Sequence, residues 1–240
     1  MKLTFTGLTD RGIIRSNNQD SYHCDSNNRF FIVADGMGGH AGGEEASRIA
    51  TQEINSYLST HWQSPQTTPQ LLEDALLMAN EAILADQQAN PQRSDMGTTV
   101  VVVAIRDNSA FCAHIGDSRI YRLRYKEIEQ LTEDHTWVAK AIKMGDISAE
   151  EARIHPFRHV LSQCLGREDL HQYDISPIDI QAGDRLLLCS DGLTEELIDT
   201  QISEYIQNSP SLETAAQSLV EGAKKAGGHD NITVVLICVE

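Results

Sequence analysis

Aspartate stands beside or close to glycine at four corners of this chain, where an apolar segment ends or a tight turn is expected. These residues are Asp35, Asp117, Asp191 and Asp230, and each alone is well explained by a turn, because aspartate and glycine are turn formers. A carboxylate at the end of a buried strand is costly, however, unless a positive group meets it. A hard divalent cation would do so, because such cations take carboxylates, carbonyl oxygens and water as ligands. The repeated pattern therefore predicts a cation site.

The predicted ligands are all oxygen atoms, which favour Mg²⁺ or Mn²⁺ over zinc. If the four corners meet, the mutual repulsion of their carboxylates must be offset by cations. Two such ions about 3.5–4 Å apart would activate a bridging water for in-line attack on a phosphate ester. Three histidines, His135, His155 and His159, could instead suggest zinc, but their spacing matches no standard zinc-ligand pattern. The pattern therefore predicts phosphate-ester hydrolysis.

A polar hexapeptide near the N-terminus, residues 15–20, adds a fixed cation and a further carboxylate. Taken alone, its composition is typical of a surface loop. Arginine makes bidentate contacts with phosphate, so Arg15 is a candidate phosphate-binding residue.

The spacing of apolar residues predicts the strands and helices that must position these residues. Short apolar or β-branched segments predict buried strands over residues 30–34, 98–105, 110–115, 184–190 and 232–239. Helical spacing predicts three helices, namely one from Glu44 onward, one after the link 63–69, and one with its N-cap at Ser209 before Pro210. The strands on either side of 107–108 and a third from Tyr121 onward favour an antiparallel meander. The expected fold class is therefore α+β.

Residues 132–169 interrupt the strand pattern. Two helical pieces are expected there, 137–144 and 148–154, and the second opens on a capping box formed by Ser148 and Glu151. A long insertion between strands is often a lid or a segment that contacts substrate.

The composition argues against several classes of function. The chain has 240 residues and a net charge of −16, which disfavours nucleic acid and anionic membranes as partners. The N-terminus lacks the apolar segment of a signal peptide, and no apolar run approaches the ~18 residues of a membrane span. Five cysteines without a CxxC pair fit a reducing compartment, so we expect a cytoplasmic protein. No repeat or linker divides the sequence, which predicts a single domain over residues 1–240.

The motifs together resemble those of the bacterial metal-dependent serine/threonine phosphatases, the PPM or protein phosphatase 2C family. They run in the family's order over essentially the whole chain, as RSNNQD, VADGMGGHAGG, MGTT, GDSR, DHT, HVLSQCLG, SDG and GHDNIT. The resemblance implies a central antiparallel β-sandwich with helices on both faces (α-β-β-α) and the metals at one end. It also implies hydrolysis of phosphoserine and phosphothreonine in a phosphorylated protein partner, by a water or hydroxide that bridges the metals.

The resemblance assigns metal-binding roles to individual residues. It implies that Asp35 bridges two Mg²⁺ or Mn²⁺ ions, with the Gly36 carbonyl on one of them. Asp191 and Asp230 would hold the other ion.

Four further roles follow from the same resemblance. Asp20 would contribute through water, and Asp117, in GDSR, fits the position linked to a third, weaker ion. Arg15 would bind the phosphate, and His40 resembles the general acid that protonates the leaving serine or threonine oxygen. In this sequence Met-Gly-Gly separates His40 from Asp-Gly, whereas the family's simplest pattern has the histidine directly after them.

Residues 134–165 match the family's flap, which lies near the site and varies between members. The sequence shows no regulatory or membrane extension and resembles the minimal stand-alone type, for which we expect a monomer. A phosphorylated PII-like signalling protein is one substrate that the resemblance suggests.

Two alternatives remain open. A non-catalytic member of the same fold would bind phosphoproteins without turning them over. The segment from Gly36 to Ala41 also fits the G-x-G-x-x-A pattern of dinucleotide-binding proteins. Against that alternative, Asp35 would direct a carboxylate at the pyrophosphate, and residues 63–69 do not form the expected second strand.

Overall fold

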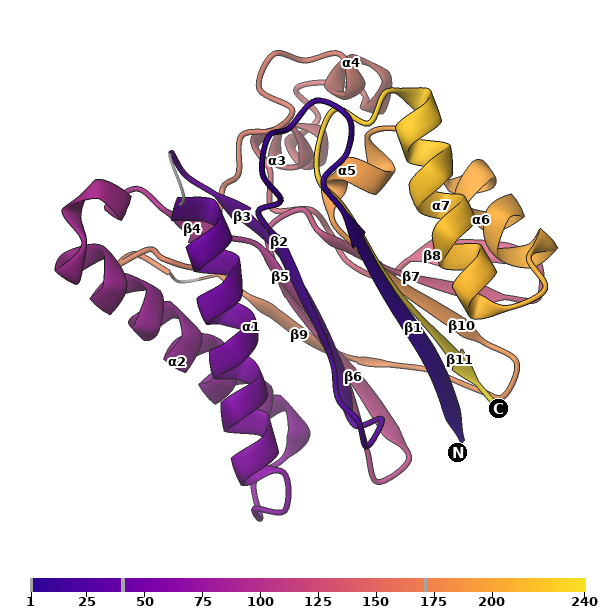
Figure 1. Ribbon diagram of the computed structural model, residues 1–240, viewed down its shortest axis with the longest axis horizontal. Coiled ribbons are helices and arrows are strands. Elements are labelled where there is room, and N and C mark those ends of the chain that lie inside the picture. Colours follow the sequence, from indigo (N-terminus) through magenta and orange to yellow (C-terminus); the bar gives the residue numbers. More distant parts are fainter. Residues whose placement is uncertain (1, 40–41, 171) are drawn as a thin grey trace.

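Two antiparallel β-sheets lie face to face, with helices on the outer side of each (Figure 1). The structure is a computed structural model that describes residues 2–39, 42–170 and 172–240. We name the two layers the β1 sheet and the β3 sheet after strands β1 (Leu3–Asp10) and β3 (Phe30–Met37), one from each layer.

The β1 sheet is made of five strands from distant parts of the chain. Their order across the sheet is β1 (Leu3–Asp10), β11 (Ile232–Val239), β10 (Arg185–Cys189), β7 (Arg119–Arg124) and β8 (Glu127–Gln130). The order across the β3 sheet is β2 (Asp20–Cys24), β3 (Phe30–Met37), β5 (Val100–Arg106), β6 (Ser109–Ile115) and β9 (Asp174–Ile178), and the short β4 (Gly97–Thr98) also pairs with β3. The first and last strands of the chain are therefore neighbours.

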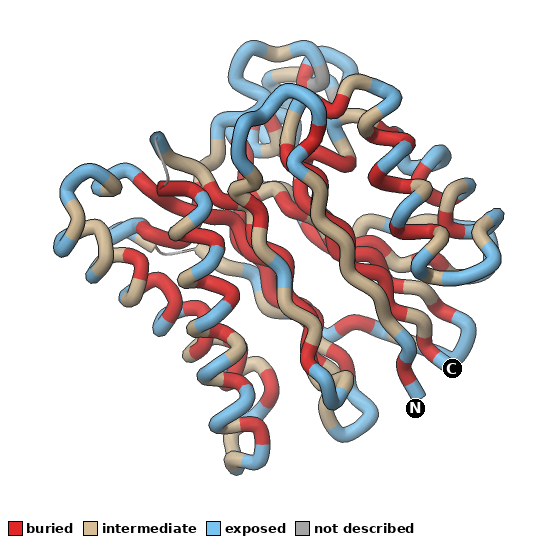
Figure 2. Tube along the Cα trace, in the orientation of Figure 1, coloured by how far each residue is buried: buried red, intermediate tan, exposed pale blue. Residues whose placement is uncertain are grey.

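Side chains of β3 alternate between two apolar layers, as expected for a strand buried on both faces. Phe31 and Val33 pack between the two sheets, whereas Phe30 and Ile32 pack against helices on the outer side. Figure 2 shows the resulting pattern, in which the strands and the inward faces of the helices are buried and the outer helix faces are exposed.

The helices form the two outer layers. α1 (Gly42–His61) and α2 (Thr68–Ala89) cover the β3 sheet, and α6 (Asp199–Asn208) and α7 (Leu212–Ala226) cover the β1 sheet (Figure 1). The chain also contains a short 3₁₀ helix, η1 (Pro91–Arg93), and the four-residue α5 (Asp191–Thr194). The α-β-β-α arrangement predicted from the sequence is confirmed.

Three local predictions were wrong in detail. The N-cap of α7 is Ser211, whose side chain accepts a hydrogen bond from the Thr214 amide, so the predicted cap at Ser209 is displaced by two residues. The strand predicted to end at Ala34 continues to Met37, so Asp35 lies within β3 rather than on a turn. The predicted meander is also wrong, because the chain crosses from β6 to the opposite sheet before β7 begins.

Gly116, with φ of +103°, lies in the turn that makes this crossing. Such a backbone conformation strains any residue with a side chain, and a Cβ on Gly116 would lie 2.6 Å from Thr99 Cβ. The chain therefore turns where the Gly116 segment approaches Thr99 closely. The alternation of hydrophobic residues in the sequence does not predict this contact.

The flap predicted over residues 134–165 lies at the same end of the sandwich as the loop that joins β1 to β2, and both contribute residues to one cavity (Figure 1). The flap contains α3 (Trp137–Met144) and α4 (Ala149–Arg153), and the predicted capping box between Ser148 and Glu151 is confirmed. Across the described residues, no helix combines the length and apolarity needed to cross a membrane.

Candidate metal centre

Four of the predicted aspartates line one cavity of about 1550 Å³, at the end of the sandwich where the flap lies. They are Asp35, Asp117, Asp191 and Asp230. The fifth, Asp20, is buried opposite Asp35 in the β2–β3 strand pair. The structure therefore brings together carboxylates that are scattered over the sequence.

The backbone of Asp35 is held by the MGTT segment that enters β5. The Asp35 carbonyl accepts hydrogen bonds from the Thr99 amide at 2.9 Å and the Thr98 hydroxyl at 2.8 Å. The Asp35 amide donates to Thr99 Oγ1 at 3.1 Å, and that hydroxyl also lies 2.7 Å from Ser118 Oγ. The two threonines thus fix Asp35 and connect it to the GDSR turn.

Gly36 occupies a site where two backbone segments approach closely. A Cβ at this position would lie 1.9 Å from the Gly43 carbonyl oxygen and 2.7 Å from the Gln19 carbonyl oxygen. Only glycine therefore fits beside Asp35, whatever ligand its carbonyl binds.

Asp20 is oriented by two buried hydroxyls. Its Oδ2 accepts hydrogen bonds from Ser190 Oγ at 2.7 Å and Thr233 Oγ1 at 2.6 Å. Its Oδ1 is buried and has no hydrogen-bond partner among the described residues. Burial raises the pKa of Asp20 to about 7, and the neighbouring Asp191 and Asp230 add to the rise while the two hydroxyls oppose it.

Burial and neighbouring negative charges also raise the pKa values of three other carboxylates. Burial, together with the charges of the neighbouring aspartates, raises the pKa of Asp35 and of Asp117 well above the ordinary value. Burial and the charge of Asp230 raise the pKa of Asp191, whose Oδ1 has no hydrogen-bond partner among the residues described. Clustered carboxylates with unpaired, buried oxygens are the donor set of a hard divalent cation, so these residues fit such an ion.

Arg15 extends from the β1–β2 loop to the edge of this cluster. Its Nη2 lies 2.6 Å from Asp230 Oδ2, and about half of its side chain is exposed. The predicted phosphate-binding residue therefore contacts a predicted metal ligand directly. His40, predicted as the general acid, lies outside the described residues.

Comparison with known proteins identifies the family. A family model described as protein phosphatase 2C matches residues 14–227. The chain belongs to the protein phosphatase 2C family. Its enzyme class, a phosphoprotein phosphatase that depends on divalent metal ions, is confirmed at the level of this family.

Individual phosphatases of the family match over nearly the whole of this chain. Protein phosphatase PhpP of Streptococcus pneumoniae is 38% identical over 234 residues, which cover 96% of this chain and 95% of PhpP. The crystal structure of the serine/threonine phosphatase PstP of Mycobacterium tuberculosis has a TM-score of 0.89 and 37% identity, with 99% of both chains covered. A PstP catalytic domain in complex with two manganese ions has a TM-score of 0.87 and 35% identity, again over 99% of both chains.

The dinucleotide-binding alternative is wrong for this phosphatase. Strand β3 pairs antiparallel with β2, β4 and β5, whereas a dinucleotide-binding βαβ unit requires parallel strands.

The three histidines considered for zinc have separate partners in the phosphatase. His155 stacks on Trp137, with ring centroids 4.8 Å apart, and His135 lies 3.2 Å from Asp174. His159 Nδ1 lies 2.5 Å from Glu195 Oε1, where both line the phosphatase cavity.

Sequence reasoning missed two residues of the phosphatase site. The buried Asn231 binds three backbone groups of the β1–β2 loop, whereas the sequence pattern singles out only its neighbour Asp230. Glu195 follows Asp191 by four positions, and burial and the charges of Asp191 and Asp230 raise its pKa to about 8. The four-residue spacing, which brings residues together on a helix, was the available signal for Glu195.

Proposed function

We propose that this chain hydrolyses phosphoserine and phosphothreonine in proteins by direct attack of water on phosphorus, with divalent cations held by the clustered carboxylates. The observation that carries the proposal is the convergence of five aspartates, from five separate segments, on one end of the sandwich. Two of them have a buried oxygen without a hydrogen-bond partner among the described residues, which a cation would satisfy.

Each carboxylate has a proposed place in this centre. Asp35 would serve both ions, the Gly36 carbonyl would be a further ligand of one of them, and Asp191 and Asp230 would hold the other. Asp20 contributes through water, which suits its recessed position beside two hydroxyls.

We propose Mg²⁺ or Mn²⁺ as the bound ions. Asp117 would supply a ligand to a third, weaker ion. When bound, such cations polarise phosphoryl oxygens and lower the pKa of water, so that a strong nucleophile exists at neutral pH.

Two residues act on the substrate itself. Arg15 binds the phosphate, and its contact with Asp230 keeps the guanidinium at the edge of the cavity before substrate arrives. His40 protonates the serine or threonine oxygen as it leaves. His40→Ala is therefore expected to slow alkyl phosphates more than aryl phosphates, whose leaving groups need no proton, and equal losses would reject this role.

The decisive experiment is hydrolysis of a phosphothreonine peptide in EDTA and then with added Mn²⁺ or Mg²⁺. Asp191→Asn serves as the site variant, and Asp107→Asn, at a side chain 91% exposed, is the control for loss of one negative charge. Metal-restored turnover in the wild type and the control, but not in Asp191→Asn, supports the proposal. Phosphopeptide binding without turnover in any metal would instead favour a non-catalytic phosphoprotein-binding protein.

The proposal also covers the domain extent, the oligomeric state, the location in the cell and a candidate substrate. The chain acts as a single domain over residues 1–240, supported by the apolar layer that both sheets share. We propose a monomer in the cytoplasm, consistent with five free cysteines. A PII-like protein phosphorylated on serine is a candidate substrate, tested by comparing its dephosphorylation with that of phosphorylated casein.

A further inference from the structure

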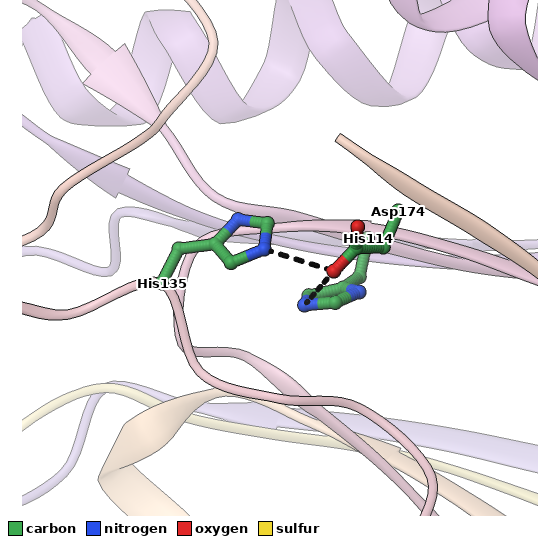
Figure 3. Close-up of side chains that lie close together, drawn as sticks. All are labelled: His114, His135 and Asp174. Carbon is green, nitrogen blue, oxygen red and sulfur yellow. Dashed lines mark hydrogen bonds and ion pairs between the residues drawn. The ribbon is translucent and has the colours of Figure 1, made fainter. Parts of the chain in front are cut away.

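Two buried histidines and an aspartate meet on the β3 sheet, outside the carboxylate cluster (Figure 3). His114 lies on β6, His135 follows β8, and Asp174 begins β9. The Nε2 atoms of His135 and His114 lie 3.2 and 4.0 Å from Asp174 Oδ2, and each histidine side chain is only 3% exposed. The ring centroids of the two histidines are 4.4 Å apart.

The hydrogen bonds of this cluster argue against a metal site. The Gly116 amide donates to His135 Nδ1 at 3.3 Å, so in the neutral ring the proton of His135 is on Nε2 and is donated to Asp174. His114 Nε2 lies 2.8 Å from the Glu133 carbonyl oxygen, which can only accept, so this nitrogen also carries a proton. A metal ion needs a free lone pair, and neither of these nitrogens offers one.

The same bonds connect His135 to the turn that carries Asp117. Besides accepting from the Gly116 amide, His135 donates its own amide to the Gly116 carbonyl at 2.8 Å. His135 therefore holds both polar groups of the residue that precedes Asp117, at the point where the backbone takes a left-handed conformation against Thr99.

The residue before His135 holds the other side of this turn. Asp134 accepts hydrogen bonds from Arg119, at 2.9 Å from Nε to Oδ1 and 2.7 Å from Nη2 to Oδ2. Two adjacent residues, Asp134 and His135, thus bind on the two sides of Asp117: His135 the backbone of Gly116, and Asp134 the side chain of Arg119.

We infer that His135 is a positioning residue for the Asp117 carboxylate, with its ring held in one tautomer by Asp174. The inference rests on the proposed function, in which Asp117 binds the weakest of the metal ions. It predicts that the affinity for this ion depends on an acceptor at the Nδ1 position of residue 135 rather than on the volume of the ring.

Two substitutions separate these possibilities. In His135→Asn the side-chain oxygen can stand near the Nδ1 position and accept from Gly116, whereas in His135→Gln the amide reaches the Nε2 position and leaves the Gly116 amide unpaired. We expect His135→Gln to weaken the weakest Mn²⁺-binding step by about tenfold, the scale typical for groups that orient metal ligands. In His135→Asn, the affinity of this step should stay within about threefold of the wild type.

The experiment is isothermal calorimetry of the whole protein with Mn²⁺ alone, accompanied by thermal unfolding in EDTA. A double-mutant cycle with Asp117→Asn decides whether His135 acts through Asp117. The expected result is no further loss of Mn²⁺ affinity when His135→Gln is added to Asp117→Asn. Additive losses, or equal affinities in His135→Gln and His135→Asn, would overturn the inference.

The calorimetric readout requires no turnover. A wild type that binds Mn²⁺ but hydrolyses no phosphopeptide would therefore refute the proposed function and still leave the cycle measurable. If the variants lose Mn²⁺ affinity only to the extent that their midpoint of thermal unfolding in EDTA also falls, His135 supports folding alone. That result would also overturn the inference.

Discussion

Asp20 shows how the environment of one residue prepares it for a cation. Two hydroxyls fix one of its oxygens, and burial leaves the other without a partner among the described residues. In the metal-free protein the charged form of this carboxylate is disfavoured, which is why its pKa rises from 3.8 to about 7. An acid with a raised pKa in the folded state destabilises that state when it ionises, so the penalty is absent below about pH 4 and complete above about pH 7.

Asp20→Asn is therefore expected to stabilise the metal-free protein at pH 8 by up to about 4 kcal/mol, the scale of a three-unit change in pKa. The gain should be small at pH 4, where Asp20 is protonated in both states. Urea unfolding in EDTA at the two pH values measures the effect, and Asp107→Asn controls for net charge. Identical pH dependence in wild type, Asp20→Asn and the control would contradict the raised pKa.

Arg15 is the residue whose loss should affect substrate more than metal. Arg15→Gln removes a charge-assisted contact to phosphate, and such contacts contribute about 1.5–3 kcal/mol, or roughly 10- to 150-fold in binding. We expect KM for a phosphopeptide to rise about tenfold or more, with a smaller change in the Mn²⁺ concentration needed for half-maximal activity. Steady-state kinetics at saturating metal measure this effect.

The control for Arg15 is another arginine of the same loop. Arg11 is exposed and donates a 3.3 Å hydrogen bond to the Ser16 carbonyl. Arg11→Gln removes the same charge at the same end of the molecule and should leave KM nearly unchanged. An unaltered KM in Arg15→Gln, or equal increases in the two variants, would reject the phosphate-binding role.

At the scale of elements, one side chain from the opposite end of the chain binds three backbone groups of the β1–β2 loop. Asn231, just before β11, donates from Nδ2 to the carbonyls of Arg11 and Asn17, both at 2.9 Å. Its Oδ1 accepts from the Gln19 amide at 2.7 Å. The buried Asn231 amide therefore joins three backbone positions of the loop that carries Arg15 to the site, in addition to the hydrogen bonds that the Ile13 and Ile14 amides donate to the Gly228 carbonyl.

Asn231→Ala should lower the free energy of unfolding by about 2 to 4 kcal/mol, because three backbone groups lose a partner in a buried site. Faster hydrogen exchange at the Gln19 amide should accompany this loss, and both are measurable in EDTA. Asn208→Ala, at an exposed residue at the end of α6, is the control. A comparable loss in both variants would show that the loop does not depend on Asn231.

At the scale of the molecule, an apolar core holds together carboxylates that repel one another. Three apolar layers, one between the sheets and one under each helix pair, account for the core, while the carboxylates gather at one end of it. The chain as a whole carries a net charge of −16, so cations relieve repulsion both locally and globally. Metal binding and folding stability should therefore be coupled.

Mn²⁺ at about 100 times its dissociation constant should stabilise the fold by about 2.7 kcal/mol per site. For a chain of this size we expect the midpoint of thermal unfolding to rise by about 5–10 °C. The rise should be larger at pH 8 than at pH 5, because the raised pKa values of the ligands let protons compete with metal at low pH. NaCl at equal ionic strength separates site binding from screening, and equal shifts with the two salts would argue against a specific centre.

The sequence by itself determined the elements and the identity of the chemistry. Hydrophobic periodicity is a local property, so α1, α2 and the last strand, β11, fall close to their predicted positions. Aspartate beside glycine at strand ends, together with the motif order, indicated a metal-dependent phosphatase before any distance was known.

Only the tertiary structure decided which groups meet. Asp20 is held by hydroxyls 170 and 213 positions away, and no local pattern predicts such pairs. The crossing from β6 to β7 between the sheets, and the hold of His135 on Gly116 beside Asp117, likewise depend on close approaches of separate segments. Periodicity reports which face of an element is buried, whereas the electrostatic and hydrogen-bonding environment of a site arises only when the layers are packed together.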